Sequence, residues 1–414
     1  MSSTPPSPPS LSLDQFTYDL PAHFIAVHPL PERDQSRMLV YRLADNSISH
    51  QHFTDLPELL PRGSLLVVNC TRVIAARINM VKPTGGAVEV LLTDPVSPIR
   101  DPAVVLASTE PSAWRCLIGG RNVFVGMVLQ EPHSDLEATV TERTGTEAIV
   151  ELSWSRGISL SQVLSEVGHL PLPPYIHRAA DAEDNVRYQT VYAVDEGSVA
   201  APTAGLHFTE RSFNALALRD IERTEVTLHV GLGTFRPVDA VDVRDHQMHE
   251  ERFGMTRAVL EKILRHVRSG VPWITAVGTT SLRTLESVFL FGAKLCRDGL
   301  ASHHTADVEQ WDAFDTSLQQ FTREDSIDKV LAWMDSHVLH EIWGNTRLMI
   351  APGCNIAMVD ALVTNFHQPG NTLLLLVAGF CGEHEWRKIY DAALENKYRF
   401  LSYGDSSLLI RTPL

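Results

Sequence analysis

The feature of this sequence that most constrains its fold is a change of texture at about residue 75 and again at about residue 159. Between these positions Gly, Pro and Asp turns divide the chain into short β-rich pieces such as VKPTGGAVEVLLT and EAIVELSW. Regular short strands without helices indicate a small β-barrel or sandwich. After residue 160, strands and helices alternate, which indicates α/β packing with a largely parallel sheet. The sequence therefore predicts an α/β protein with a second, all-β domain.

Apolar patterns place the main elements of the α/β part. Residues 259–267 form one apolar helical stripe, and Gly270 just beyond it is a natural stop. Thr209 is placed to cap a helix that runs to about Arg219. We expect further helices at residues 281–291 and 327–337, and strands at residues 38–41, 65–69, 226–230, 273–277, 347–352 and 359–366.

A run of small residues from Ser198 to Gly205 leads into His207. Small side chains let a backbone approach a ligand closely, and Gly205 can adopt a positive φ. A strand-like approach, a tight loop, a polar side chain and a helix start together form a usual ligand site in α/β proteins. A well-packed turn whose small residues admit a neighbouring element is the structural alternative. Thr203, Gly205 and His207 are candidate site residues on the first interpretation.

A second candidate site lies where a strand gives way to a helix at Gly278, Thr279 and Thr280. Free backbone N–H groups and the helix dipole favour a carboxylate or phosphate at such a position. Arg283 could add a bidentate clamp. In the structural alternative, Thr280 caps the helix and Arg283 pairs with Glu286. We favour the anion site.

Two further strands end in polar residues, as binding loops often do. One leads into a glycine-rich segment that lacks the spacing of a dinucleotide-binding loop. His367 follows the second of these strands, and a capping or core hydrogen bond is the alternative role for it. The candidates are His229, Gly231 and Thr234 at the first strand, and Asp360, Asn365 and His367 at the second.

The pattern His246-x-x-His249-x-Glu251 superficially resembles a metal site. Two histidines and a carboxylate can coordinate zinc, but this is not an established helical ligand spacing. We favour His249 and Glu251 as polar active-site residues, with satisfied structural polar groups as the rival interpretation.

Composition limits the location and the partners. The five cysteines are odd in number and form no C-x-x-C pair, which indicates a reducing cytoplasm. No apolar run has the length of a membrane span, and MSSTPPSPPS is typical of a disordered tail rather than of a secretory signal. The net charge of −15 argues against a general nucleic-acid binder but leaves room for a local basic groove.

Nine segments spread over nearly the whole chain resemble the S-adenosylmethionine:tRNA ribosyltransferase-isomerases, which build the epoxycyclopentane ring of the nucleoside queuosine. Any one segment would be weak, but together and in family order they are highly specific. The segments are YDLPAHFIAVHPLPERDQSRMLV (18–40), VVNCTRVIAARI (67–78), LPLPPYIHR (170–178), YQTVYAVDEGSVAAPTAGLHFT (188–209), VTLHVGLGTFRPV (226–238), HQMHEERF (246–253), VGTTSLRTLES (277–287), VDALVTNFHQPGNTLLLLVAGF (359–380) and YRFLSYGDSSLLI (398–410).

The resemblance implies a large α/β, barrel-like catalytic domain with an inserted small β-barrel domain. The catalytic domain would comprise residues 16–74 and 160–414, and the inserted barrel residues 75–159. Residues 1–15 would be a disordered tail, and residues 293–335 an insertion within the catalytic domain.

The reaction implied by the resemblance moves and isomerises the ribosyl part of S-adenosylmethionine onto 7-aminomethyl-7-deazaguanine at the tRNA wobble position. Adenine and methionine leave, and epoxyqueuosine is formed. The tRNA partner would present a single-stranded anticodon loop with its target base flipped out. Phe208, Tyr188 and Phe366 are possible stacking platforms, although each is better explained as core. A cytoplasmic monomer without a metal is expected, with S-adenosylmethionine as co-substrate.

The sulfonium of S-adenosylmethionine acidifies the neighbouring 5′ carbon, so a positioned base could form an ylide there. His207 is the first candidate for this base, followed by His229 and His249. The matched motif implies that Arg283 contacts S-adenosylmethionine. The candidate substrate-binding residues are Thr203, Gly205, Gly231, Thr234, Thr279, Thr280, Glu286, Asp360, Asn365 and His367.

Two other functions stay open at this point. Cys70 stands where the family usually has an acidic residue, which together with the segment 293–335 allows a catalytically inactive tRNA-binding paralogue. The polar residues retained at the candidate site argue against that. A metal-dependent hydrolase using His246, His249 and Glu251 is the second alternative.

Overall fold

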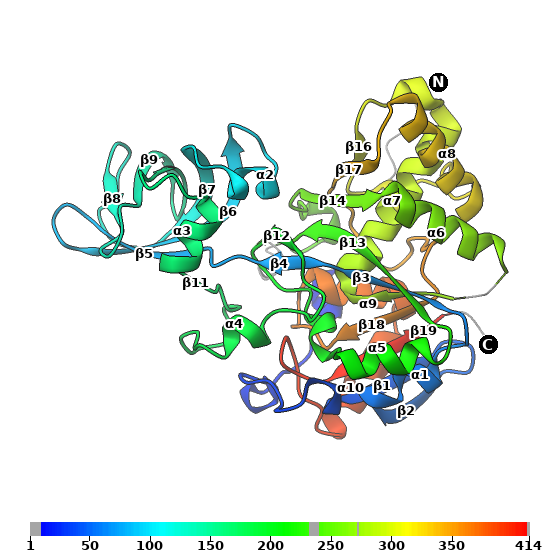
Figure 1. The fold of residues 1–414 in the computed structure, drawn as a ribbon. Coiled ribbons are helices and arrows are strands. Elements are labelled where there is room, and N and C mark those ends of the chain that lie inside the picture. The colour runs from blue at the N-terminus through cyan, green and yellow to red at the C-terminus, as the bar shows by residue number, and fades with distance from the viewer. Residues whose placement is uncertain (1–9, 232–239, 271–272, 412–414) are drawn as a thin grey trace.

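The structure is a computed structural model that describes residues 10–231, 240–270 and 273–411. It has two parts, a small β-barrel and a larger α/β part built on a ten-stranded sheet (Figure 1). The predicted fold class is confirmed in both parts. The domain boundaries given above, and the insertion at 293–335, stay predictions.

The barrel closes because its first strand pairs with both of its neighbours in the ring. The ring order is β5-β6-β7-β10-β9-β8, and β5 returns to β8 through Val81 and Gln130. Side chains along β7 alternate between buried and more exposed, as expected when one face lines a core. The strands are β5 (Arg77–Val81), β6 (Ala87–Ser97), β7 (Ser112–Ile118), β8 (Val128–Gln130), β9 (Glu137–Thr144), β10 (Glu147–Ser153) and the short β11 (Gly168–His169). The expectation of strands without helices was wrong in one place, because Asp101 caps a short helix, α2 (Pro102–Ala107).

Four adjacent parallel strands form the centre of the larger sheet, and their carboxyl ends meet at one edge. They are β13 (Glu222–His229), β3 (Leu65–Asn69), β15 (Ile274–Val277) and β18 (Ala361–Asn365). On one side the sheet continues through β19 (Ser406–Ile410), β1 (Arg37–Arg42) and β2 (Ser47–His52). On the other it continues through β14 (Glu251–Thr256), β17 (Glu341–Thr346) and β16 (Ala306–Val308). A separate parallel pair consists of β4 (Thr71–Val73) and β12 (Asp195–Ser198).

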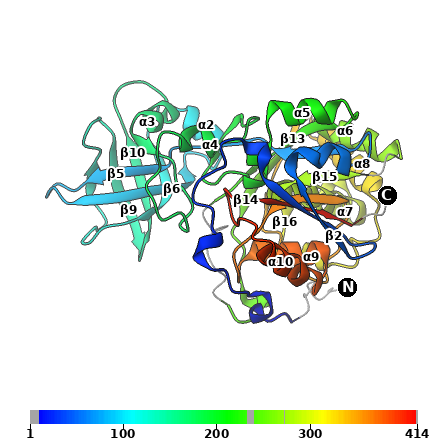
Figure 2. The same cartoon turned by 90° about the horizontal axis from the view of Figure 1, so that it is seen from below.

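Helices cover the larger sheet on both faces. Figure 2 shows α9 (Thr372–Cys381) and α10 (Glu385–Glu395) on one side and α5 (Glu210–Ala217) on the other. The long helix α7 (Gly278–Asp298) is buried over most of its length and packs against α8 (Arg323–Ser336), which also contacts α6 (Arg257–Arg268). The short helices are α1 (Leu56–Leu59), α3 (Leu160–Val167) and α4 (Asp184–Arg187). Among the described residues, no helix is both long and apolar enough to cross a membrane.

Most predicted elements of the α/β part are confirmed, including the cap at Thr209 and the end of α6 before Gly270, whose φ is +71°. The predicted strand at 347–352 is wrong. The strand β17 ends at Thr346, and the apolar residues that follow, Leu348 to Ile350, are buried as irregular chain. A short apolar run records burial but not backbone shape, so the pattern could not distinguish the two.

Candidate active site

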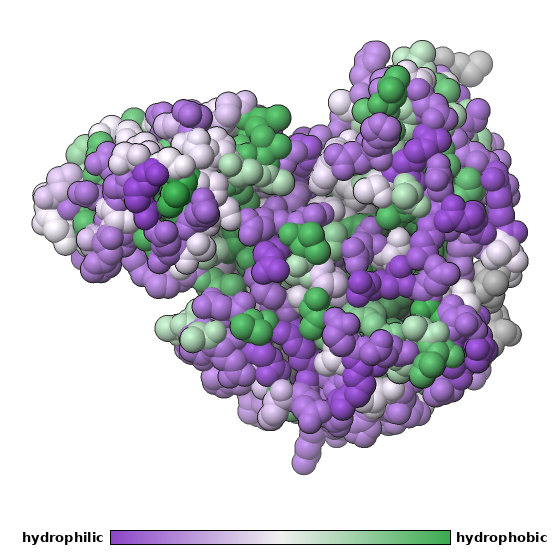
Figure 3. All heavy atoms as spheres, viewed as in Figure 1, coloured by the Kyte–Doolittle hydropathy of each residue, from purple (hydrophilic) through white to green (hydrophobic). Residues whose placement is uncertain are grey.

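A cleft of about 540 Å³ lies between the barrel and the larger part. Its barrel wall includes residues of β6 and β7, and its other wall includes His229, Gly231 and His249. The molecular surface is hollowed between the two parts (Figure 3). Pockets for small molecules commonly enclose about 300–1,000 Å³, so the cleft is large enough for a nucleoside-sized ligand.

His229 is a buried histidine of this cleft whose ring nitrogens are both unoccupied among the described residues. It is the last residue of β13 and is only 6% exposed, yet neither ring nitrogen has a hydrogen-bond partner among the described residues. Its ring stacks on Trp343 at 6.0 Å with an interplanar angle of 5°. Burial lowers the pKa of His229 to about 4, an effect that nearby Asp101 and Asp195 oppose. The imidazole is therefore neutral near pH 7 and has a free lone pair.

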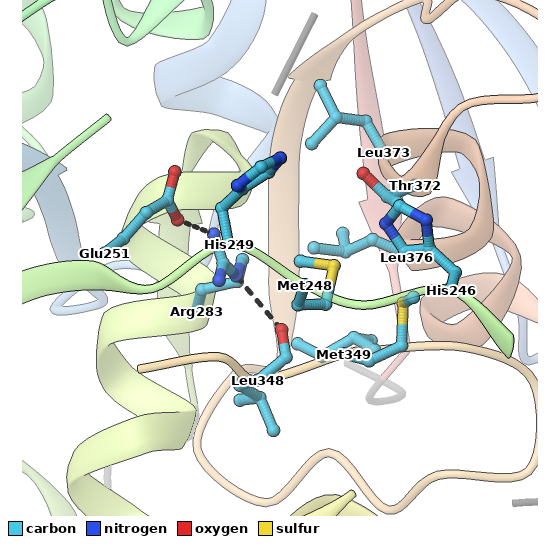
Figure 4. A pocket seen from close by; sticks show the side chains of 11 residues that line it. His246, Met248, His249, Glu251, Arg283, Leu348, Met349, Thr372, Leu373 and Leu376 are labelled. Carbon is cyan, nitrogen blue, oxygen red and sulfur yellow. Dashed lines mark hydrogen bonds and ion pairs between the residues drawn. The ribbon is translucent and has the colours of Figure 1, made fainter. Parts of the chain in front are cut away.

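Arg283 forms a buried ion pair with Glu251 rather than with Glu286 (Figure 4). Its Nε also donates to the Leu348 carbonyl at 3.2 Å, and burial lowers its pKa to about 10. Nη2 of Arg283 is buried and has no hydrogen-bond partner within the described ranges. The pair lines a cavity of about 30 Å³, which has room for about one water. His249 is exposed and lines both this cavity and the large cleft.

His246, His249 and Glu251 do not share a metal site. Figure 4 shows the two histidines on different sides of the small cavity, while the Glu251 carboxylate is turned toward Arg283. In the part of the chain that the structure describes, no three His, Cys, Asp or Glu side chains are placed to hold a metal ion together. The resemblance to a metal-binding pattern was therefore only one of spacing.

The start of α7 contradicts the structural alternative, in which Thr280 caps the helix and Arg283 pairs with Glu286. The helix begins at Gly278, with φ of +85°, and has no side-chain cap. Thr280 is therefore inside the first turn, and its Oγ1 is buried without a hydrogen-bond partner among the described residues. Thr279 is also buried. The first backbone N–H groups of α7 stay available to an anion, but these residues do not line the large cleft.

Two predicted binding residues hold the fold together. Glu286 accepts hydrogen bonds from the backbone N–H groups of Ala357 and Met358 at 2.9 and 2.7 Å. Asp360 accepts two hydrogen bonds from Arg323 at 2.7 and 2.8 Å, which ties α8 to the start of β18. These carboxylates are already engaged within the chain, and the assignment of Glu286 and Asp360 to substrate stays a prediction.

His207, the first candidate base, has a partner at each ring nitrogen. Asn365 Nδ2 donates to Nε2 at 3.1 Å, so Nδ1 carries the proton and donates to Ser36 Oγ at 2.8 Å. The ring also stacks on Phe53 at 5.2 Å. Burial lowers the pKa of His207 to about 3. With its lone pair occupied, and away from the large cleft, His207 is better explained as a structural histidine.

Thr203, Asn365 and His367 line a separate cavity of about 30 Å³. Nε2 of His367 is 3.0 Å from Thr364 Oγ1, and burial lowers the pKa of His367 to about 3. This matches the core hydrogen bond considered for it above. Phe208, Tyr188 and Phe366 are fully buried and are core residues. Gly231 lines the large cleft, and Thr234 lies outside the described residues.

Gly205 is required for packing and not for backbone conformation. Its φ is not positive, but a Cβ at this position would overlap the hydroxyl of Tyr192. We expect Gly205→Ala to lower the free energy of unfolding by about 1–3 kcal/mol, as overpacking does. Gly119→Ala is the control, because a Cβ there meets only ordinary contacts at 3.7 Å. Urea unfolding measures both, and equal stability of the two variants would contradict this explanation.

The buried histidines predict how stability depends on pH. The pKa values of His207, His229 and His367 are about 3, 4 and 3, against about 6.5 in an unfolded chain. Below about pH 6.5 the unfolded chain binds protons that the folded state refuses, so the free energy of unfolding falls as pH drops. Each ring contributes about 1.4 kcal/mol per pH unit in that window. Urea unfolding between pH 7 and 5 should show a shallower slope for His367→Gln, and an unchanged slope would refute the assignment.

No sequence pattern pointed to several residues around His229, among them Trp343, Arg252 and Asp101. The sequence also did not show which side chains surround Cys70. The Cys70 thiol donates to Asp195 Oδ2 at 3.4 Å, and burial raises the pKa of the thiol to about 12. The carboxylate beside Cys70 is therefore that of Asp195, on β12.

Sequence comparison relates the chain to one protein family over almost its whole length. The family model described as "Queuosine biosynthesis protein" matches residues 13–409. An S-adenosylmethionine:tRNA ribosyltransferase-isomerase of Anaeromyxobacter sp. (strain Fw109-5) is 39% identical over 402 residues, covering 97% of this chain and 99% of that one. The protein of the same name from Anaeromyxobacter dehalogenans (strain 2CP-C) is 40% identical over 403 residues, covering 97% and 100%.

A solved structure, the S-adenosylmethionine tRNA ribosyltransferase of Thermotoga maritima, is 26% identical, covers 96% of this chain and 100% of its own, and superposes with a TM-score of 0.47. The family match and the curated relatives extend over almost the whole length. The chain belongs to the queuosine biosynthesis family of S-adenosylmethionine:tRNA ribosyltransferase-isomerases.

Proposed function

We propose that this protein transfers and isomerises the ribosyl moiety of S-adenosylmethionine onto 7-aminomethyl-7-deazaguanine at the wobble position of tRNA. The products are epoxyqueuosine-tRNA, adenine and methionine. The observation that carries the proposal is the buried, unpartnered imidazole of His229 in a cleft wide enough for a nucleoside. Such an imidazole can remove a proton from the 5′ carbon beside the sulfonium, which is the chemistry that this transfer requires.

S-adenosylmethionine would occupy the cleft with its 5′ carbon facing His229, and His249 at the rim is the second candidate for proton transfer. The amino-acid carboxylate of the co-substrate would extend beyond the cleft lining to the uncapped start of α7 near Thr279 and Thr280. Arg283, held by Glu251, has one buried N–H group to offer. No metal has a role in this mechanism.

The anticodon loop of the tRNA would enter between the barrel and the larger part. The cleft lining includes three arginines for phosphate contacts, interspersed with the carboxylates of Asp94, Glu147, Glu250 and Glu251. The arginines are Arg100, Arg115 and Arg252. We place the protein in the cytoplasm, where its tRNA substrate is found and where its five free cysteines would stay reduced. We propose that it acts as a monomer.

Nucleoside mass spectrometry tests this function. The purified protein is incubated with S-adenosylmethionine and tRNA carrying the deazaguanine precursor, and the tRNA is then digested. A nucleoside heavier by the epoxycyclopentane unit, with adenine released in equal amount, is the expected result. Binding of S-adenosylmethionine without any new nucleoside would refute the substrate, and binding of tRNA alone would indicate an inactive paralogue.

A further inference from the structure

The side chain of His229 shares one face of a sheet with Arg252 and Trp343, neither of which takes part in the proposed proton transfer. In the antiparallel strands β13, β14 and β17, His229 lies opposite Arg252, and Arg252 lies opposite Asn345. Trp343 is two residues before Asn345 and therefore points to the same face. Direct and diagonal neighbours on such a face are within reach of aromatic and long side chains.

Gly254 makes the space in which the Trp343 ring lies. It is the cross-strand partner of Trp343, and a Cβ at this position would stand only 2.5 Å from Trp343 Cζ3. The indole therefore lies over a residue without a side chain. There it stacks on His229, while the guanidinium of Arg252 lies 4.8 Å from the indole centroid, within cation–π range.

The barrel closes this arrangement from the other side of the cleft. Asp101, the N-cap of α2, forms an ion pair with Arg252 at 2.9 Å, and both side chains are largely buried at 14% and 27% exposure. The next residue, Pro102, packs on Gly197, where a Cβ would be 2.6 Å from Pro102 and 3.1 Å from His229 Nδ1. Asp101 and Pro102 of the barrel thus contact two residues beside His229. Asp101 pairs with Arg252, and Pro102 packs on Gly197.

We propose that Trp343 and Arg252 are positioning residues for His229, and that the ion pair of Arg252 with Asp101 makes their position depend on docking of the barrel. This inference rests on the proposed role of His229 as the base. His229 has no hydrogen bond among the described residues to fix its ring, so packing against Trp343 and Gly197 sets the ring's direction. A base displaced by about 1 Å can lose about 10²-fold in rate, so this packing matters to the reaction.

The stack is tested first without any substrate. Protein labelled with ¹⁵N- and ¹³C-histidine gives imidazole resonances, and the His229 resonance is identified by its loss in His229→Gln. In Trp343→Leu we expect that resonance to lose its ring-current shift, and in Asp101→Asn and Arg252→Gln to move or broaden. An unchanged His229 resonance in Trp343→Leu would overturn the proposal, even if the protein proved to have another substrate.

Kinetics then separate positioning from simple stability. We expect Trp343→Leu to lower kcat about 10- to 100-fold with little change in KM for S-adenosylmethionine, and Trp343→Phe, which keeps an aromatic face, to restore most of that loss. Trp311→Leu is the control, because it removes a partly buried indole that packs on Phe314 and does not line the cleft.

The link to the barrel is tested by combining substitutions. If Asp101 acts through the stack, adding Asp101→Asn to Trp343→Leu should lower kcat less than the product of the single effects. Fully multiplicative effects would overturn the dependence on barrel docking. A wild-type protein that forms no epoxyqueuosine would refute the proposed function, while the histidine spectra would still decide the stack.

Discussion

Replacement of His229 by glutamine is expected to lower kcat for epoxyqueuosine formation about 10³-fold while leaving S-adenosylmethionine bound. Glutamine is similar in size and polarity but cannot accept a proton. The imidazole is neutral at pH 7 because burial lowers its pKa to about 4, and both of its nitrogens lack partners among the described residues. The decisive measurement uses S-adenosylmethionine deuterated at the 5′ carbon. Wild-type protein should release that deuterium to water, and the variant should not.

Two further histidines complete that experiment. Nε2 of His266, on α6, donates to the Trp273 carbonyl group at 3.2 Å outside the cleft, so His266→Gln should leave kcat unchanged. Because a ring nitrogen facing a carbonyl oxygen must carry the proton, His266 is the donor in this bond. His207→Gln distinguishes the structure-based choice of base from the first sequence-based one. If His207→Gln stops deuterium release and His229→Gln does not, His207 is the base and His229 is only packed.

The contrast between these histidines shows how far sequence alone could go. Both follow patterns typical of sites, a small-residue loop for His207 and a strand end for His229. What separates them is whether the ring nitrogens are occupied, and the partners of His207 are 171 and 158 residues away in the chain. No local pattern encodes such contacts. The same is true of Gly205. The sequence shows that a small residue stands there, but it does not show that the Tyr192 hydroxyl leaves no room for a side chain.

The fold was easier to predict, because it depends on local periodicity. The alternation of strands and helices and the β-rich texture of the barrel are visible within windows of about ten residues. The prediction was wrong where buried apolar residues do not form a strand, as in the apolar segment after Thr346. The structural alternative to the anion site paired Arg283 with Glu286 in its own helix, but the partner of Arg283 is Glu251 on β14, which only the assembled sheet brings near.

That buried pair leads to the largest expected effect on stability. We expect Arg283→Met to lower the free energy of unfolding by about 3–5 kcal/mol, since it removes the guanidinium charge that pairs with the buried Glu251 carboxylate. Arg283 and Glu251 side chains are only 7% and 6% exposed, so water cannot replace the lost guanidinium. Glu251→Gln should also destabilise the folded state, because it removes the negative charge that pairs with the buried Arg283 guanidinium. Urea unfolding at pH 7 measures each variant.

The double variant Arg283→Met with Glu251→Gln distinguishes a coupled pair from two independent packing losses. Removing both charges removes the desolvation cost of each, so the double variant should be destabilised by less than the two single variants combined. The exposed pair of Arg268 with Glu324, at 49% and 48% exposure, is the control, and Arg268→Met should cost no more than about 1 kcal/mol. Strictly additive losses in the double variant would show that packing, and not the ion pair, holds Arg283 in place. Arg283 could then turn its Nη2 toward a substrate carboxylate without the cost of breaking an ion pair.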